Sequence, residues 1–359
     1  MISVCIITKN EADKLERCLT SIKQADPNNL MEIVIADTGS TDNTIAMSKK
    51  YTDKIFEFEW CDDFSAARNF SINKATGEYI LILDSDEYIV EFDMQVLLQL
   101  ISTNKDSVGR ITRIDEYVQN DELVRVSFNF NRFFKKDLYA YRGRIHEQVV
   151  LRNTNGDMQK SDDYKTYNTP IKILHDGYNG DITKSKIERN LKLLLKDLEE
   201  FGDDPYILYQ TGRGYYLAKD YEKACEYYGR ALEFDLDPQL EYVKNMVESY
   251  GYSLINSDNS ETARLLLGAP EVYEAFSSNA DFCFMMGLVY MNCAKFSRAI
   301  EEFNKATTLP CNIEGSNSYK AYYNIAVIYE CLGVTDKALI YYKKCGKYAP
   351  AIKRLATLK

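Results

Sequence analysis

The sequence predicts an α/β domain with a doubly wound, mostly parallel sheet, followed by an all-helical repeat domain. Three observations lead to this prediction. Short apolar runs alternate with helical patterns between Ile2 and Leu83. Polar and acidic residues follow these runs, where the carboxyl ends of parallel strands meet. Small and aromatic residues recur at a fixed spacing from Gly212 onwards, which indicates stacked helix pairs. We therefore predict two domains, residues 1–183 and 184–359.

The composition is that of a globular protein. The chain has 359 residues, enough for two domains, with 45% hydrophobic and 27% charged residues. A net charge of −10 argues against nucleic acid as a partner, because phosphate binding requires clustered Lys and Arg. The nine cysteines include no Cys-x-x-Cys pair, so we expect reduced thiols rather than a zinc site or disulfides. We find no signal peptide and no transmembrane segment in the sequence, which predicts a cytoplasmic protein.

Four strands and the helices between them account for the first part of the chain. A helical pattern over residues 15–22 follows the first strand, and Phe64–Ala75 predicts another helix. After the second strand, Ser40 or Thr41 is expected to cap a helix, with Asp42 at its positive end. The predicted strands are Ile2–Ile7, Glu32–Ala36, Ile55–Phe58 and Ile80–Leu83.

The fourth predicted strand runs directly into three carboxylates. Ile80–Leu83 has no helical period and suits a strand that is buried on both faces. Asp84, Asp86 and Glu87 follow it, and they would repel one another unless a cation lay between them and a ligand. A solvated acidic turn would account for the same residues. The sequence has no Gly-x-Gly-x-x-Gly and no Gly-Lys-Ser/Thr, so a bound nucleotide would depend on side chains and a metal ion.

Beyond residue 91 the pattern changes. Val108–Val118 and Leu123–Phe134 alternate weakly and predict antiparallel strands. The chain has two histidines, His146 and His175, and both follow these stretches beside acidic residues. A lone histidine is more often structural than catalytic, but two out of two beside carboxylates favour a functional role.

Several of these segments together suggest a family. The first four are Thr8–Glu11, Asp37–Asp42, Asp63–Asn69 and Leu83–Glu87, and the later ones are Tyr141–Val149, Ile173–Tyr178 and Lys184–Leu194. The first four resemble the ordered motifs of glycosyltransferase family 2, whose members have the Rossmann-like GT-A fold. The later three resemble a narrower bacterial subgroup, which includes lipopolysaccharide-core glucosyltransferases and the peptide S-glycosyltransferases of glycocin bacteriocins. The resemblance implies transfer of a sugar from a UDP-sugar, with inversion.

The resemblance also implies which residues bind the donor. Asp37 is expected to accept a hydrogen bond from the uracil N–H, and Asp84 is expected nearer the ribose or a bound water. Arg68 would contact the diphosphate, although an Arg in a helix is as easily a structural ion pair. The remaining donor-site residues are Thr8, Asn10 and Glu11, which frame base and ribose, and Ser85 between the two aspartates.

The predicted chemistry uses a divalent metal and one base. By resemblance, Asp86 is the metal ligand in this DXD-type motif and His175 is a candidate further ligand for Mg²⁺ or Mn²⁺; an imidazole ligand suits Mn²⁺ better. An inverting transfer needs one base to take the acceptor proton. We predict Glu147 as this base, with His146 as a substrate contact or substitute base. Glu87 is the alternative, because it adjoins the acidic cluster.

The second half of the chain predicts tetratricopeptide repeats. Each copy has a small residue followed 12 residues later by Ala. Small residues are needed where two helices cross closely, and the aromatic residues fill the gaps between helices. The copies are Gly212, Tyr215, Ala224 and Ala231; Gly251, Leu254 and Ala263; Gly287, Tyr290, Ala299 and Ala306; and Ala326, Tyr329, Ala338 and Cys345.

Such an array presents a concave face for a peptide or a partner subunit. We therefore predict a glycosyltransferase that modifies a Cys, Ser or Thr side chain of a peptide or protein recruited by the repeats. In one alternative the acceptor is a cell-surface glycan and the array only docks a dimer or membrane protein. In another the chain is an inactive repeat scaffold. The array is also open to a purely packing or homodimer-forming role.

Overall fold

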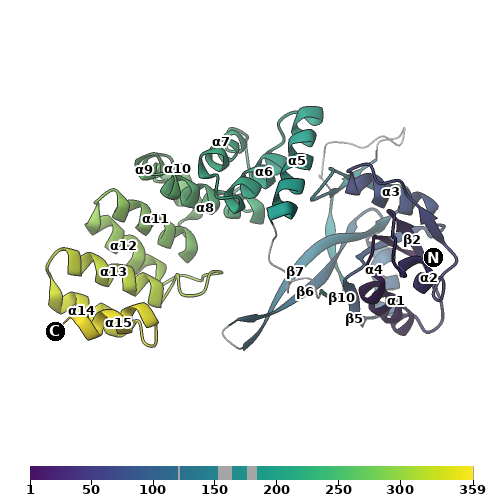
Figure 1. Cartoon of the computed structure of the whole chain (residues 1–359), viewed down its shortest axis with the longest axis horizontal. Helices are drawn as coiled ribbons and strands as arrows, with labels where there is room; N and C mark the ends of the chain where they lie inside the picture. The colour runs from purple at the N-terminus through teal and green to yellow at the C-terminus, as the bar shows by residue number, and fades with distance from the viewer. Residues whose placement is uncertain (120–121, 153–163, 176–183, 359) are drawn as a thin grey trace. The chain divides into compact units, whose positions relative to one another are not determined.

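The structure is a computed structural model, and it describes residues 1–119, 122–152, 164–175 and 184–358. It divides into two compact units, Met1–Leu193 and Leu194–Lys359 (Figure 1). This division falls inside helix α5 (Lys184–Phe201). The predicted domain boundary at residues 183 and 184 lies at the start of the same helix and stays a prediction.

An eight-stranded sheet forms the centre of the first unit. Its strand order is β3-β2-β1-β4-β7-β6-β10-β5, and a separate two-stranded sheet pairs β8 with β9. The strands are β1 (Ile2–Thr8), β2 (Met31–Asp37), β3 (Ile55–Glu57), β4 (Tyr79–Asp84), β5 (Glu87–Phe92), β6 (Val108–Gln119), β7 (Glu122–Lys135), β8 (Tyr139–Arg142), β9 (Gln148–Leu151) and β10 (Thr166–His175). The helices are α1 (Ala12–Ala25), α2 (Thr44–Ser48), α3 (Phe64–Lys74) and α4 (Met94–Thr103).

Most neighbouring strands in the large sheet are parallel, as predicted. The parallel pairs are β3–β2, β2–β1, β1–β4 and β10–β6, and the antiparallel pairs are β4–β7, β7–β6 and β10–β5. The predicted antiparallel pairing of residues 108–118 with 123–134 is therefore confirmed.

The apolar runs are continuous because both faces of the sheet are covered. Val4 and Leu81 pack into the core on the side of α1, whereas Cys5 and Ile80 pack into a second core that contains Ile72 of α3. Successive residues of one strand thus enter different cores, so every position must be apolar. This is the physical basis of the strands that the sequence predicted.

One alternative and one local prediction were wrong. Glu87 does not belong to a solvated turn; it begins β5 and is fully buried. Neither Ser40 nor Thr41 caps α2, because that helix starts at Thr44. Asp42 instead accepts a hydrogen bond from the Thr44 N–H at 2.9 Å, so it does satisfy a donor at the helix start.

The second unit consists of stacked helix pairs (Figure 1). The four predicted copies correspond to the pairs α6–α7, α8–α9, α11–α12 and α13–α14. The helices are α6 (Pro205–Leu217), α7 (Tyr221–Ala231), α8 (Glu241–Asn256), α9 (Ser260–Leu267), α10 (Pro270–Phe276), α11 (Ala280–Asn292), α12 (Phe296–Ala306), α13 (Tyr319–Cys331), α14 (Thr335–Lys344) and α15 (Ala349–Thr357).

The glycines of the repeats lie where paired helices touch. A Cβ on Gly212 would come within 2.7 Å of the Tyr228 ring, and one on Gly287 within 2.6 Å of the Phe303 ring. These positions therefore exclude any larger residue unless the neighbouring ring moves. Among the described residues, none of the helices combines the length and apolar character that crossing a bilayer requires.

Candidate active site

The carboxyl ends of three adjacent strands bring the predicted donor-site residues to one edge of the sheet. In the strand register, Thr8 of β1 lies opposite Asp37 of β2, and Ile7 of β1 lies opposite Asp84 of β4. This edge is where open α/β sheets bind ligands. The segments after these strands therefore form the floor of the candidate site.

Thr8 and Asp37 each carry a buried oxygen that has no partner among the described residues. Asp37 Oδ2 accepts hydrogen bonds from the backbone N–H groups of Gly39 (3.1 Å) and Ser40 (2.9 Å). Asp37 Oδ1 and Thr8 Oγ1 are buried without a hydrogen bond. An unpaired buried acceptor costs about 1–3 kcal/mol, so a ligand that donates a hydrogen bond here would recover that cost.

Asn10 and Glu11 shape the loop beside these oxygens. The Asn10 side-chain oxygen accepts a hydrogen bond from Thr41 N at 2.7 Å, and the Asn10 N–H donates to Ser40 Oγ at 2.9 Å. The Glu11 N–H donates to Thr44 Oγ1 at 3.0 Å. These contacts tie the loop after β1 to the loop after β2. The framing role predicted for both residues stays a prediction.

Two arginines neutralise the first and third acids of the cluster. Arg132 of β7 places Nη2 2.9 Å from Asp84 Oδ2 and Nη1 2.6 Å from Glu87 Oε2. Arg68 of α3 places Nη2 2.7 Å from Asp84 Oδ1. Although desolvation acts to raise the pKa of Asp84, Arg132 and Arg68 hold it well below its usual range. Burial raises the pKa of Glu87, and Arg132 opposes that effect.

Arg68 also reaches the predicted base. Its Nε donates to Glu147 Oε1 at 2.5 Å, so one buried guanidinium connects Asp84 with Glu147. The Glu147 side chain is 12% exposed to solvent. Arg68 Nη1 is buried and has no hydrogen-bond partner among the described residues. The structural ion pair considered for Arg68 is therefore present, and its contact with a diphosphate stays a prediction.

The second acid of the cluster has different surroundings. Asp86 lies in the turn between β4 and β5, and its Oδ2 is 3.4 Å from His175 Nε2 at the end of β10. The other ring nitrogen, His175 Nδ1, is 3.1 Å from Oδ1 of Asp115 on β6. Burial opposes both shifts, but the contact lowers the pKa of Asp86 and raises the pKa of His175. The sequence analysis connected these two residues only as predicted metal ligands. In the structure their side chains are in contact.

This pair fits a divalent cation. Asp86 supplies a carboxylate and His175 an imidazole, with Asp115 behind the imidazole as metal-bound histidines usually have. In the described part of the chain, no three His, Cys, Asp or Glu side chains are grouped as a complete metal site. Asp86 and His175 would therefore share the cation with a ligand such as a diphosphate.

Two further predicted residues flank the site. His146 adopts a left-handed backbone conformation with φ of 53°, directly before Glu147. Ser85 lies in the turn with Asp86 and is half-buried. The Asp176–Tyr178 part of the histidine motif and the junction before Lys184 lie outside the described residues. The roles assigned to His146 and Ser85 stay predictions.

Sequence reasoning missed Arg132, Arg113 and Asp115. All three lie within the predicted strands Val108–Val118 and Leu123–Phe134, where the sequence analysis assigned no role to individual charged residues. A detectable signal existed: Arg113 and Asp115 are two residues apart in β6 and so share one face of it. Arg132 lies at an irregularity in the pairing of β7 with β6, among the aromatic residues Phe130, Phe133 and Phe134. A charge inside such an aromatic stretch indicates an ion pair that is shielded from solvent.

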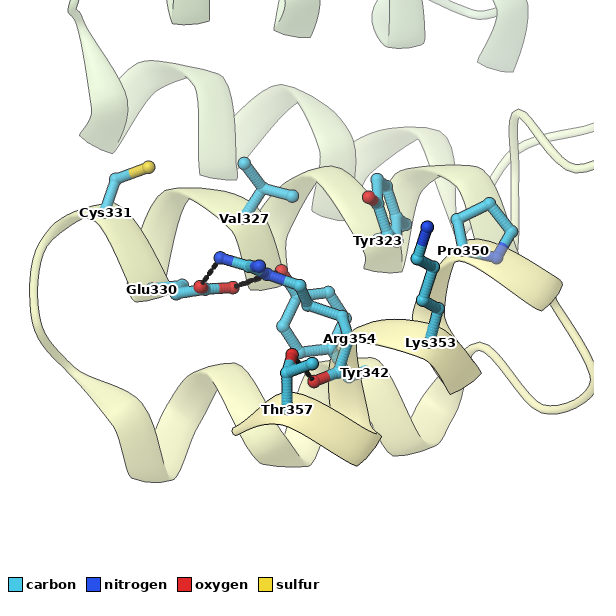
Figure 2. Close-up of a pocket in the computed structure, with 9 residues that line it drawn as sticks. All are labelled: Tyr323, Val327, Glu330, Cys331, Tyr342, Pro350, Lys353, Arg354 and Thr357. Atoms are coloured by element: carbon cyan, nitrogen blue, oxygen red, sulfur yellow. Dashed lines mark hydrogen bonds and ion pairs between the residues drawn. The ribbon is translucent and has the colours of Figure 1, made fainter. Parts of the chain in front are cut away.

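The repeat array contains a cavity of about 450 Å³ among α13, α14 and α15. Figure 2 shows Tyr323 and Val327 of α13 on one wall and Arg354 of α15 reaching to Glu330. Tyr342 donates its hydroxyl hydrogen to Glu330 Oε2 at 2.7 Å. The remaining lining residues are Cys331, Pro350, Lys353 and Thr357. The lining combines the aromatic rings of Tyr323 and Tyr342 with charged groups, of which Glu330 and Arg354 are paired with each other.

Comparison with known families and proteins agrees with the two-unit architecture. Residues 3–152 match the profile of glycosyl transferase family 2, and residues 205–237, 280–310 and 319–352 match tetratricopeptide repeat profiles. A TPR repeat-containing protein of Synechococcus elongatus is 44% identical over 216 residues, which are 59% of this chain and 51% of that protein.

Two named glycosyltransferases are also similar. Glycosyltransferase SunS of Bacillus subtilis is 27% identical over 241 residues, 63% of this chain and 52% of SunS. The lipopolysaccharide core biosynthesis glycosyltransferase LpsC of Rhizobium meliloti is 27% identical over 165 residues, 44% of this chain and 59% of LpsC. The chain spans about half the length of the curated relatives it matches.

Proposed function

Because the chain carries a glycosyltransferase family 2 domain followed by tetratricopeptide repeats, we propose that it is an inverting, metal-dependent glycosyltransferase. The donor is a UDP-sugar carrying a hexose or an N-acetylhexosamine. The acceptor is a Cys, Ser or Thr side chain of a peptide or protein that the repeats bind.

One observation carries the donor part of this proposal. Asp37 Oδ1 and Thr8 Oγ1 are buried, unpaired and side by side in the strand register. The uracil ring offers an N–H donor between two carbonyl groups, so Asp37 accepts this hydrogen and Thr8 serves a neighbouring group of the nucleoside. The loops held by Asn10 and Glu11 close around base and ribose.

The acidic turn receives the diphosphate end of the donor. Asp86 and His175 hold Mg²⁺ or Mn²⁺, which as a Lewis acid stabilises the negative charge that develops on the leaving UDP. Asp84 is fixed by Arg68 and Arg132, which also bind Glu147 and Glu87, so this group of side chains carries no net positive charge and a bound diphosphate would depend on the cation. The unpaired Nη1 of Arg68 is available to a phosphate oxygen.

Glu147 acts as the base. The acceptor oxygen or sulfur attacks the anomeric carbon from the face opposite to UDP, the bond from that carbon to the β-phosphate oxygen breaks, and Glu147 takes the acceptor proton. Arg68 fixes the orientation of the Glu147 carboxylate. The alternative base, Glu87, is fully buried and bonded to Arg132, which does not suit a group that must contact an acceptor.

The repeats supply the acceptor specificity. The resemblance of the His146 and His175 segments to peptide S-glycosyltransferases supports a peptide or protein acceptor, and so does the cavity between α13 and α15. The similarity to LpsC supports a second candidate, a glycosyltransferase that extends a cell-surface glycan. Both candidates share the donor site and differ in the acceptor.

A hydrolysis panel tests the donor assignment. The full chain is incubated with UDP-glucose, UDP-galactose and the two UDP-N-acetylhexosamines, with Mn²⁺ or with EDTA, and released UDP is measured. We expect slow hydrolysis of at least one donor with Mn²⁺ and none in EDTA. Equal hydrolysis in EDTA would contradict the proposed metal requirement, and no UDP release from any donor would contradict the proposed UDP-sugar donor.

A library of peptides with a single Cys, Ser or Thr tests the acceptor, with mass spectrometry as the readout. Val327→Asp introduces a charge into the cavity wall. We expect it to raise KM for an acceptor peptide found in this library about tenfold or more, while hydrolysis of the UDP-sugar stays unchanged. Ile340→Asp is the matched control, because Ile340 is 54% exposed on α14 outside the cavity. Transfer only to glycan acceptors would favour the second candidate.

A further inference from the structure

Arg113, Asp115 and His175 form a continuous series of contacts that ends at Asp86 of the predicted cation site. Arg113 Nη2 donates to Asp115 Oδ2 at 3.1 Å, and Arg113 Nε lies 2.9 Å from Asp115 Oδ1. Asp115 Oδ1 is 3.1 Å from His175 Nδ1. His175 Nε2 then faces Asp86 Oδ2 at 3.4 Å. This series of contacts therefore runs from the half-buried guanidinium of Arg113 to the acidic turn.

The sheet fixes this arrangement. His175 of β10 lies opposite Asp115 of β6 in the parallel register, so the two side chains are neighbours on one face. Arg113 precedes Asp115 by two residues on that face, and its guanidinium carbon is 4.4 Å from the centre of the Phe130 ring. Asp115 itself is 1% exposed, so no substrate can reach it.

A carboxylate in this position determines which ring nitrogen of the histidine carries the hydrogen. Because a carboxylate only accepts hydrogen bonds, His175 must carry a hydrogen on Nδ1 to bond Asp115. The lone pair that remains for a cation is then on Nε2, and that nitrogen faces Asp86. Histidine ligands of metals are usually oriented in this way by a second carboxylate.

We propose that Asp115, braced by Arg113, is a positioning residue that orients His175 and selects its Nδ1–H form, so that Nε2 and Asp86 together bind the divalent cation. This inference rests on the cation of the proposed function. Asp115 touches neither nucleotide nor cation and acts only through His175.

Asp115→Asn tests the proposal in the full chain. Asp115 Oδ2 accepts from Arg113 Nη2 and Oδ1 contacts His175 Nδ1, and an amide cannot accept at both positions because one of its end atoms is a donor. We expect the Kd of Mn²⁺ in the presence of UDP, measured by electron paramagnetic resonance, to rise about 10- to 100-fold. The Kd of UDP measured in EDTA stays unchanged, because that measurement does not involve His175.

Glu32→Gln is the matched control. Glu32 is also a carboxylate in an ion pair, with Lys54, and its side chain is 7% exposed, but it lies near the amino ends of the strands. The control is expected to lower thermal stability and to leave the Mn²⁺ affinity unchanged. A folded Asp115→Asn protein whose Mn²⁺ Kd is within twofold of the unmodified chain overturns the proposal.

A second measurement on the unmodified chain needs no variant at Asp115. The chain has two histidines, so ¹⁵N-histidine labelling gives two sets of ring signals, and His146→Gln assigns them. With UDP and Mg²⁺, we expect hydrogen on Nδ1 of His175 and none on Nε2. The opposite form overturns the positioning role even if Asp115→Asn does not fold. If the unmodified chain binds no Mn²⁺ with UDP, the metal part of the proposed function fails and the role of Asp115 fails with it.

Discussion

Asp37→Asn is the substitution that separates nucleotide recognition most cleanly from folding. Asp37 Oδ2 accepts from the N–H groups of Gly39 and Ser40, and Oδ1 is buried and unpaired. In the variant, the amide oxygen must stay on the Oδ2 side to keep those two hydrogen bonds. The amide NH₂ then occupies the Oδ1 position, where the proposed function places the uracil N–H. Two donors would face each other.

The expected loss follows from the hydrogen bond that disappears. A hydrogen bond to a charged group contributes about 1.5–3 kcal/mol, which corresponds to about 10- to 150-fold weaker UDP binding. Cytosine carries an acceptor nitrogen where uracil carries the N–H. The variant NH₂ of residue 37 donates to that nitrogen, so CDP binding is expected to strengthen while UDP binding weakens. The Kd of CDP divided by the Kd of UDP is therefore expected to fall by a larger factor than the Kd of CDP alone.

Calorimetric titration of UDP and CDP with Mn²⁺ present measures both effects. Asp42→Asn is the control, because Asp42 is an exposed acid of the same loop whose side chain bonds Thr44 at the start of α2. We expect the control to bind both nucleotides as the unmodified chain does. If Asp37→Asn binds UDP with unchanged affinity and shows no gain for CDP, the uracil contact assigned to Asp37 is wrong.

Three other substitutions test the cation, the base and Glu248, a half-buried acid of the array. Asp86→Ala is expected to abolish turnover and Mn²⁺-dependent UDP binding with the fold retained; full activity in EDTA would contradict this role. Glu147→Gln is expected to slow transfer at least about a hundredfold at unchanged UDP affinity, and normal transfer would exclude it as the base. Burial and, to a smaller extent, Asp281 raise the pKa of Glu248 from the ordinary 4.5 to about 7. The folded protein therefore holds this proton more tightly than the unfolded chain does, and its stability falls as the pH rises from about 4.5 to 7. Glu248→Gln should therefore raise the free energy of unfolding by up to about 3 kcal/mol at pH 8 and by almost nothing at pH 4, and an equal change at both pH values in denaturant titrations would refute this reasoning.

The elements that local sequence predicts are those whose whole environment is apolar. Ile2–Ile7 and Ile80–Leu83 were predicted because both faces of β1 and β4 enter cores, so every position reports burial. Gly212 and Gly287 were equally informative, because an aromatic ring of the paired helix occupies the space of a Cβ. In these cases one contact type constrains one residue type, and no distant partner is needed.

The edge of the sheet was harder to predict. β5 begins with Glu87, whose burial is stabilised by Arg132 from a strand 45 residues further along the chain, and also by Arg113. A pattern read over a short window contains no information on that partner. The same reason explains why no role was predicted for Asp115, because the His175 that it contacts lies 60 residues further along the chain.

The three acids of the cluster are distinguished by the side chains that they contact in the structure. Asp84, Asp86 and Glu87 are chemically alike, and the sequence assigned them one shared reason, repulsion relieved by a cation. In the structure Asp84 and Glu87 are already neutralised by arginines from α3 and β7, so neither needs a cation to be stable. Only Asp86 faces a histidine instead of an arginine. An imidazole can give up its proton to make room for a metal ion, whereas a guanidinium cannot be deprotonated in a protein. In the proposed function a cation would therefore bind Asp86 and His175, and the two neighbouring acids, held by their arginines, would set the position of the turn that presents Asp86.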